Sequence, residues 1–441
     1  MRVSIFRKFT ILLLLLLSLF AWQCAPKKKV DNLGFINRDA VYAQLMQISD
    51  KIMDWHLGNG RLENIHDNTA TSIFINGNLA RVLICTYELT GKQEYLQEGL
   101  RYCRFLAKSA KPVMTSKGHQ AFWWYDMEDS KNLYLADTGT AMAALFKAMP
   151  YLNKSDKRLV RSRLDGFFRL ITEGTDADPT NRNRGASPGW ICKDSGALGV
   201  GYYRGRLEKR PYIVSTAQAG VLFGSLYYKL TKKSASKKMA VRATSWLLDD
   251  FGNDGALQYD IMGQVWPQNK FQANHYSIEA LLCFFDTIKN KKLKNIYKER
   301  FPAFLNFILS SRNNNGLWGI NRTYDAQRSI FMMTALIKAM RTGFANKEIQ
   351  EAISKGLGWL QAPENAYSYG VNVLIRQTGF VGLMYADLLK EGITYSNPRK
   401  IDAPGNLVEL TRKAHELSQK MDEFEEKEFL QTNETAGHAV K

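Results

Sequence analysis

A histidine cluster in the second half of the chain has the residue types that proton transfer needs. Asn274, His275 and Tyr276 are consecutive, and Glu279 follows His275 at the spacing of one helical turn. An imidazole can act as a base near neutral pH, a phenol can donate a proton, and an amide can hydrogen-bond a substrate carboxylate. We therefore predict His275 and Tyr276 as catalytic residues and Asn274 as a substrate-binding residue. The alternative is a core histidine bonded to its neighbour.

Hydrolysis of a glycosidic bond would instead require two carboxylates, one of them kept protonated by its surroundings. Two aspartates lie in glycine-rich, aromatic sequence: Asp137 in Tyr134-Leu-Ala-Asp137-Thr-Gly and Asp194 in Gly189-Trp-Ile-Cys-Lys-Asp194-Ser-Gly. We predict both as catalytic candidates, with a helix cap as the alternative for Asp137. The further carboxylates expected on the same face are Asp67, Asp126, Glu128, Asp260 and Asp325.

Aromatic and arginine side chains accumulate around these candidates. An aromatic ring can stack on a pyranose face, and a guanidinium can bind a carboxylate or sulfate. We predict that the following residues bind the substrate: Trp124, Trp190, Tyr203, Trp266, Trp318, Arg328 and Arg376. For each residue taken singly, loop packing or simple solvation is the alternative.

Two kinds of helical segment alternate along the chain and must position these residues. Six segments are apolar on nearly all sides, which is typical of buried helices: 74–90, 136–149, 214–231, 273–288, 326–340 and 375–389. Six amphipathic segments alternate with them: 40–57, 94–109, 158–173, 235–250, 293–312 and 346–361. The order predicts six helical hairpins, each with one buried helix.

The connections between these segments are unequal in a regular way. Links from a buried to an amphipathic segment are short, whereas most links in the other direction are long, as in 111–135 and 174–213. This pattern predicts an all-α fold, the (α/α)6 toroid, with the long loops and the polar first residues of the inner helices at one end. An open solenoid is the alternative, but its repeats are shorter and its loops more even.

One of the hairpins resembles a hairpin of six-hairpin glycosidases, which include the unsaturated glucuronyl hydrolases. It runs from Asn76-Gly-Asn-Leu-Ala to Tyr87-Glu-Leu-Thr-Gly-Lys-Gln-Glu-Tyr95-Leu, with an aromatic-x-x-Thr-Gly turn and a tyrosine opening the next helix. The resemblance implies an (α/α)6 toroid and a carbohydrate-active protein. The paired catalytic aspartates of that family are not found in their usual surroundings, so the hairpin implies a superfamily and not one activity.

The first residues have the features of a bacterial lipoprotein signal. Arg2, Arg7 and Lys8 precede an apolar run over 11–20 that is too short to span a bilayer, and Cys24 follows it. We predict that Cys24 is lipidated and that the chain is exported and anchored to the cell envelope; ordinary cleavage near Ala25 is the alternative. The predicted domains are a signal peptide over 1–23, a tether over 24–39, the toroid over 40–391 and a charged extension with one helix over 392–441.

The composition limits the possible partners. The chain has 441 residues, 45% of them hydrophobic, and a net charge of +18, so it has a globular core and favours an anionic partner. It lacks CxxC, P-loop and dinucleotide motifs, so we predict no metal and no cofactor, and export argues against nucleic acid.

We therefore predict an exported enzyme that degrades acidic poly- or oligosaccharides, a glycoside hydrolase first of all. The alternatives are a polysaccharide lyase using His275 and Tyr276, and a glycan-binding lipoprotein without catalysis.

Overall fold

The chain divides into two compact units, Met1–Phe35 and Ile36–Lys441. A computed structural model describes residues 33–54, 73–124, 133–174, 189–203, 206–208, 210–249, 260–261, 264–265, 270–313, 316–318, 322–344, 346–362, 375–397 and 403–438. The predicted signal peptide and Cys24 lie outside these residues. Within them, no helix is both long and apolar enough to cross a membrane. All the described helices and strands belong to the second unit.

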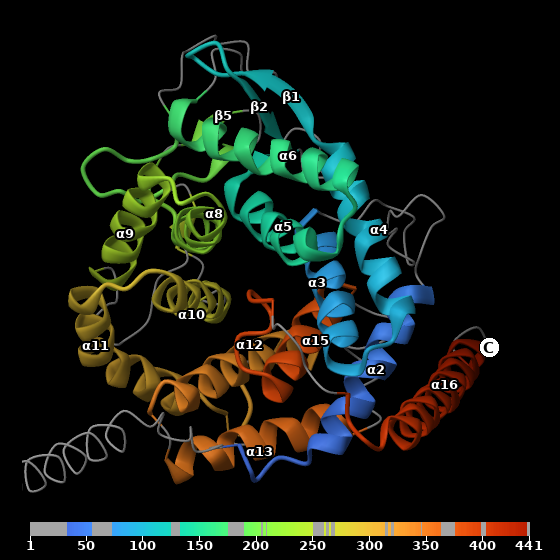
Figure 1. Cartoon of the computed structure of the whole chain (residues 1–441). Helices are drawn as coiled ribbons and strands as arrows, with labels where there is room; N and C mark the ends of the chain where they lie inside the picture. The colour runs from blue at the N-terminus through green and yellow to red at the C-terminus, as the bar shows by residue number, and fades with distance from the viewer. Residues whose placement is uncertain are drawn as a thin grey trace, which may run out of the picture. The chain divides into compact units, whose positions relative to one another are not determined.

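A closed ring of inner helices forms the centre of the second unit (Figure 1). Each inner helix contacts the next, and α15 contacts α3 to close the ring. Nearly every residue of α3 and α5 is buried, because other helices cover each inner helix on all sides. The inner helices are α3 (Ile73–Thr90), α5 (Leu135–Ala148), the continuous α7 (Ile213–Ser215), η2 (Thr216–Leu222) and α8 (Phe223–Thr231), α10 (Lys270–Thr287), α12 (Arg322–Arg341) and α15 (Ile375–Leu389).

Outer helices alternate with the inner ones; α4, α6, α11 and α13 bury one side each, whereas α2 is also covered by α16 and is buried all round over 41–49. Asparagines begin three of them: the Oδ1 atoms of Asn153, Asn290 and Asn346 accept hydrogen bonds from main-chain N–H groups in the first turn of α6, α11 and α13. The outer helices are α2 (Arg38–Asp54), α4 (Gln93–Ser109), α6 (Lys154–Glu173), α9 (Ser234–Asp249), α11 (Lys291–Ser310) and α13 (Lys347–Gln361). This alternation confirms the predicted order of helical hairpins.

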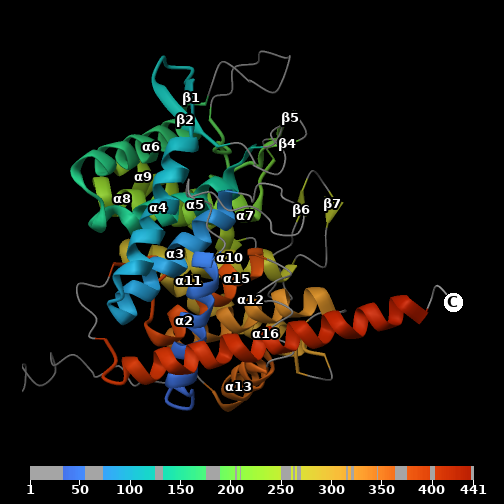
Figure 2. The same cartoon turned by 90° about the vertical axis from the view of Figure 1, so that its right-hand side faces the viewer.

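Short antiparallel strands lie in the connections from outer to inner helices, where we had expected only loops. β1 pairs with β2 between α4 and α5, β3 pairs with β4 and β4 with β5 ahead of α5 and α7, and β6 pairs with β7 ahead of α10. Figure 2 shows β4 to β7 together at one end of the ring. The strands are β1 (Lys111–Met114), β2 (Gln120–Trp123), β3 (Leu133–Tyr134), β4 (Gly201–Tyr203), β5 (Arg206–Glu208), β6 (Asp260–Ile261) and β7 (Gln264–Val265).

The two ends of the ring therefore differ. At one end, which we call the open face, the inner helices begin after connections that carry the strands. At the other end, the turn face, the inner helices finish and short turns lead to the outer helices. The turn after α5 includes the 3-10 helix η1 (Met149–Tyr151). Arg38 Nη2 at the start of α2 donates to the Leu389 carbonyl at the end of α15, 2.9 Å away. The second unit thus begins at the turn face.

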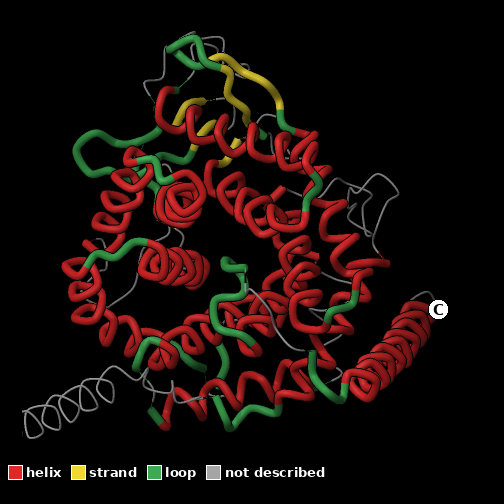
Figure 3. The backbone as a smooth tube through the Cα atoms, in the orientation of Figure 1, coloured by secondary structure: helices red, strands yellow, loops and turns green. Residues whose placement is uncertain are grey.

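Residues 392–396, which we call the axial plug, fold into the ring after α15 (green within the ring in Figure 3). Cys85 Sγ donates to the Ile393 carbonyl at 3.6 Å, and Tyr395 Oη donates to Asp286 Oδ2 at 2.8 Å. Lys147 contacts both Glu88 and the Ser396 carbonyl. The predicted boundary of the toroid at 391 leaves this segment out, although its contacts lie inside the ring.

A long helix, α16 (Leu407–His438), follows the axial plug and packs against α2 (Figure 2). Lys51 Nζ of α2 lies 3.3 Å from Asp422 Oδ1 of α16. The helix lies within the charged extension predicted over 392–441. It lies on the outside of the ring.

Candidate functional site

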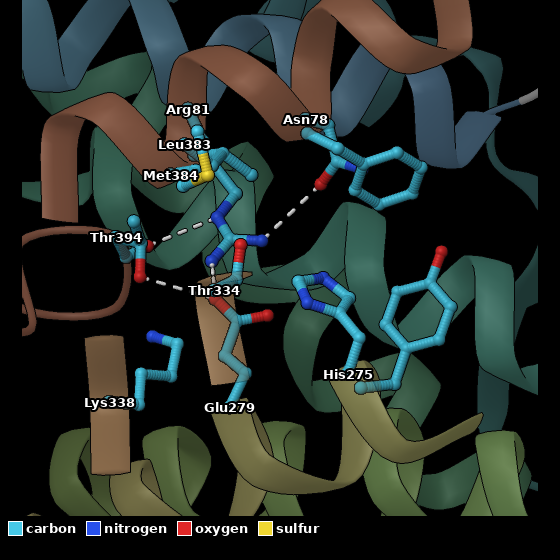
Figure 4. A pocket seen from close by; sticks show the side chains of 11 residues that line it. Asn78, Arg81, His275, Glu279, Thr334, Lys338, Leu383, Met384 and Thr394 are labelled. Carbon is cyan, nitrogen blue, oxygen red and sulfur yellow. Dashed lines mark hydrogen bonds and ion pairs between the residues drawn. The ribbon is translucent and has the colours of Figure 1, made fainter. Parts of the chain in front are cut away.

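A cluster of polar side chains lies on the ring axis between four inner helices and the axial plug (Figure 4). The space that they enclose has room for about one water molecule. A sugar ring therefore does not fit between them as they stand. The lining residues are Asn78 and Arg81 of α3, His275, Tyr276 and Glu279 of α10, Thr334 and Lys338 of α12, Phe380, Leu383 and Met384 of α15, and Thr394 of the axial plug.

Arg81 holds this cluster together. Its side chain is fully buried, and all three guanidinium nitrogens donate: Nε to the Thr394 carbonyl at 3.0 Å, Nη1 to Asn78 Oδ1 at 3.3 Å, and Nη2 to Glu279 Oε1 at 2.5 Å. Figure 4 shows these bonds converging on the guanidinium. Because every nitrogen already has a protein acceptor, Arg81 links α3, α10 and the axial plug and is not available to a substrate carboxylate.

Glu279 is the anionic partner in the cluster. Oε1 also accepts from Thr394 Oγ1 at 3.2 Å. Burial by itself raises the pKa of this carboxyl, but the guanidinium of Arg81 and then the ammonium of Lys338 outweigh it and hold the pKa at about 2. Glu279 is therefore ionised at neutral pH. Its hydrogen bonds go to α3 and the axial plug, and not to His275 as the one-turn spacing had suggested.

His275 lies beside this ion pair in an aromatic setting. Its ring stacks on Phe331 at 4.7 Å and meets Phe380 edge-on at 5.6 Å, centroid to centroid. Burial lowers the pKa of the imidazole to about 3, although Glu279 opposes the shift. The ring is therefore neutral at pH 7, and among the described residues its buried Nδ1 has no hydrogen-bond partner. An unpartnered nitrogen of this kind is a place for one water or a ligand atom.

The two predicted catalytic aspartates, Asp137 and Asp194, do not line the cluster, and the side chains of the other five predicted carboxylates lie outside the described residues. Asp137 is half-buried in the first turn of α5, at the open face. Asp194 is exposed in the connection from α6 to α7. There Arg242 donates to the neighbouring Lys193 carbonyl. Of these two, Asp137 is the one that an inner helix positions.

Three of the predicted sugar-stacking tryptophans are buried. Trp124 Nε1 donates to the Leu106 carbonyl of α4 at 2.8 Å, and Trp318 Nε1 donates to the Ile308 carbonyl of α11 at 2.7 Å. Trp190 packs after α6, where its main-chain N–H bonds the Ile171 carbonyl at 2.9 Å. Each thus covers the last turn of the preceding outer helix, whose carbonyls lack partners within the helix. Their rings have no face for a sugar, so we assign them to packing.

Of the remaining predicted residues, the structure places only Tyr276 in the cluster. Trp266 lies outside the described residues. The structure describes the main chain but not the side chains of Tyr203, Asn274, Arg328 and Arg376. Tyr276 is buried next to His275, with the two ring centroids 5.3 Å apart. The structure therefore brings together His275 and Tyr276 of the predicted set, and adds Arg81, Lys338 and Thr394 to them.

A π-helical segment, η2, positions α10 from the neighbouring inner helix. Gln218 in this segment accepts from Thr140 Oγ1 at 3.1 Å and donates through Nε2 to the Tyr276 carbonyl at 3.2 Å. Gly139 of α5 lets α5 pack closely against η2, because a Cβ at this position would lie 2.7 Å from the Ala219 nitrogen. Single π-helical turns within α-helices occur often at functional sites. Sequence periodicity does not reveal such a turn.

Known proteins show the fold but not a family. No family model matches the chain, and no curated protein matches its sequence. The family 76 α-1,6-mannanase of Salegentibacter sp. HEL1_6 is 12% identical over 79% of this chain and 99% of that chain, with a TM-score of 0.51. A polysaccharide lyase is 12% identical over 79% and 97% (TM-score 0.53), and cellobiose 2-epimerase from Spirochaeta thermophila DSM 6192 is 10% identical over 82% and 99% (TM-score 0.56).

These structures belong to the six-hairpin (α/α)6 toroid superfamily, and the chain has this fold. The toroid fold expected from the hairpin around Thr90 is therefore confirmed. Because the same fold carries hydrolase, lyase and epimerase chemistry, it does not choose among reactions.

Proposed function

We propose that the chain is a carbohydrate-active enzyme, a glycoside hydrolase that works at the open face with Asp137 as one of its two carboxylates. The observation that carries this proposal is the position of Asp137. It is a half-buried carboxylate in the first turn of an inner helix, in a fold whose similar structures include enzymes of glycans. The first turn of a helix is a favourable position for an anionic group.

The two carboxylates that we propose are not adjacent in sequence, unlike the two aspartates that are replaced in an inactive variant of the similar mannanase. An inactive variant of that enzyme has two adjacent aspartates replaced and holds α-1,6-mannotriose. In this chain Ala136 precedes Asp137, and the one adjacent pair, Asp249-Asp250, comes at the end of the outer helix α9. We therefore propose that the partner of Asp137 comes from an open-face connection, with Asp194 as our candidate, and that the substrate is not carried over from the mannanase.

A polysaccharide lyase is the second candidate, favoured by the unpartnered Nδ1 of His275 next to Tyr276. A lyase needs a base that removes a proton beside a uronate. With its pKa lowered to about 3 by burial, His275 is a weak base, and the cluster has room for about one water molecule. The hydrolase is therefore the better supported of the two.

Two narrower features also belong to the proposal. An acidic substrate is supported by the helix N-termini at the open face, but not by Arg81, whose nitrogens are all engaged; the net charge of +18 favours an anionic partner without saying which face binds it. Export and lipid anchoring are supported by the apolar run over 11–20 followed by Cys24.

The test is turnover of a panel of neutral and acidic oligosaccharides, read by reducing ends and by ultraviolet absorbance. We expect new reducing ends without new absorbance, and a fall of kcat by about 10²- to 10⁴-fold in Asp137→Asn. Asp422→Asn on α16 is the control and should retain turnover. New absorbance from an unsaturated uronide would show the lyase instead. Binding without any product would leave a glycan-binding protein.

A further inference from the structure

Exposed lysines gather on one sector of the turn face. Three consecutive inner helices, α5, α8 and α10, finish there, and their turns lead to α6, α9 and α11. Within residues 149–157, 229–238 and 286–292 the acidic residues are Asp156 and Asp286. The exposed lysines, which we call the lysine face, are Lys154, Lys157, Lys229, Lys232, Lys233, Lys237, Lys238, Lys289, Lys291 and Lys292.

Several of these lysines stand where the local structure disfavours them. The N-terminus of a helix carries partial positive charge and favours acidic residues. The first turns of α9 and α11 nevertheless contain no acidic residue, while Lys291 and Lys292 begin α11. Lys232 ends α8 in the left-handed region, with φ of 59°, a position that usually holds glycine. The chain thus departs from two local preferences, for acidic residues at helix N-termini and for glycine in the left-handed region, within one sector. Such repeated departures are expected at functional surfaces.

Within the described part of the chain, the ammonium groups of the lysine face also have no carboxylate partner. Among the residues that the structure describes, no ion pair involves any lysine of the lysine face. Asp156 is engaged by Arg104 at 2.7 Å, and Asp286 accepts from Tyr395. Several of the lysines instead lie over tyrosine rings, as Lys232 does over Tyr228 at 5.4 Å. Among the described residues, the lysines of this sector therefore outnumber its carboxylates, and the sector is strongly positive.

The lysine face lies at the end of the ring where the second unit begins. Arg38, at the start of α2, bonds the end of α15, so the first helix of the second unit begins at the turn face. An N-terminal lipid, as proposed for Cys24, would keep the chain close to a bilayer. We propose that the lysine face binds the anionic headgroups of the membrane surface and so holds the open face toward the glycan.

Lipid headgroups fit this surface better than one polysaccharide chain does. The lysines are spread over three turns, and each presents a hydrated point charge on a flexible stem. Such charges bind mobile headgroups additively, at roughly 1 kcal/mol for each lysine near the surface. The proposal does not depend on the hydrolase reaction, so either can fail without the other.

The test measures co-sedimentation of the full chain with vesicles of equal phosphatidylglycerol and phosphatidylethanolamine, and with phosphatidylcholine vesicles. Cys24→Ser in every sample removes lipidation, and the rest of the N-terminal segment is common to all samples. The test variant carries Lys232→Gln, Lys233→Gln, Lys289→Gln and Lys291→Gln. The control carries the same charge change on exposed lysines elsewhere: Lys108→Gln, Lys111→Gln, Lys117→Gln and Lys193→Gln.

We expect salt-sensitive binding of the parent chain to the anionic vesicles, and about tenfold or greater weakening in the test variant. The control should bind nearly as the parent does. Equal weakening in both variants would assign the binding to net charge and overturn the proposal. Failure of the parent to prefer anionic vesicles would overturn it as well. Circular dichroism of the two variants would show that both retain the helical fold.

Discussion

The cluster of polar side chains on the ring axis, which we call the axial cluster, and the lysine face differ in whether their charged groups are paired. On the axis, Arg81 and Glu279 are buried, 2.5 Å apart, and surrounded by further hydrogen bonds. On the lysine face, the ammonium groups stand in solvent with few carboxylates near them. The first arrangement stabilises the ring but leaves no charge for a ligand. The second contributes little to folding, and its charge is available for binding. Net charge alone therefore does not locate a binding site.

The largest effect should come from breaking the axial ion pair. In Arg81→Met the carboxylate of Glu279 loses its main partner in a site that is shielded from water. We expect a loss of about 3–5 kcal/mol in the free energy of unfolding, measured by urea denaturation. The double variant Arg81→Met with Glu279→Leu should recover much of this loss, because no buried charge is then unpaired.

An exposed ion pair provides the matched control. Lys347 lies 3.5 Å from Glu351 on α13, with both side chains largely in solvent. Lys347→Met should change the free energy of unfolding little. If Arg81→Met proves as mild as Lys347→Met, the axial cluster is not the stabilising element that its geometry indicates.

A smaller effect should appear in the pH dependence of stability. Burial lowers the pKa of His275 from 6.5 to about 3, so below about pH 6.5 the unfolded chain binds a proton that the folded chain does not. The stabilising contribution is complete above pH 6.5 and is lost as the pH falls toward 3. We expect a loss of about 2 kcal/mol from this residue between about pH 7.5 and about pH 5.

His275→Phe should remove that part of the acid sensitivity, which denaturation curves at the two pH values would measure. Glu279 does not contribute in this window, because its ordinary pKa of 4.5 lies below it and its pKa in the fold, about 2, is lower still. His415→Phe on the exposed side of α16 is the control and should keep the parent profile. If His275→Phe keeps the same difference in stability between pH 7.5 and pH 5 as the parent, the buried, neutral imidazole is contradicted.

The fold could be predicted from the sequence because the distribution of apolar residues around each helix shows how much of it is buried. Apolar residues on all sides predicted α3 and α5 as buried helices, and apolar residues on one side predicted α4 and α6 as outer helices. The predicted bounds agree with the structure to within a few residues. The strands were missed because two to four residues, as in β6 and β1, are too short to show a period of two. The axial plug was missed because its burial depends on helices distant in sequence.

Part of the axial cluster was visible in the sequence for the same reason, although its catalytic role stays a prediction. His275 and Tyr276 stand out because they interrupt an apolar helix, and Arg81 interrupts α3 in the same way. Its partner Glu279 is 198 residues away, so the pairing itself could not be predicted. The burial of Trp124, Trp190 and Trp318, which we had predicted to stack on sugars, could not be predicted because a loop has no periodicity that shows which side is buried. Their hydrogen bonds to Leu106 and Ile308 are visible only in the fold.

The smallest effect concerns the backbone of the lysine face. Lys232 has φ of 59° at the end of α8, where a side chain is disfavoured and glycine is not. Lys232→Gly should therefore stabilise the protein by about 1 kcal/mol, measured by thermal or urea unfolding. Lys232→Gln keeps a Cβ and should have nearly no effect. If both variants stabilise equally, repulsion among the lysines and not the backbone is the cause, and the lysine face then reduces stability through its charge.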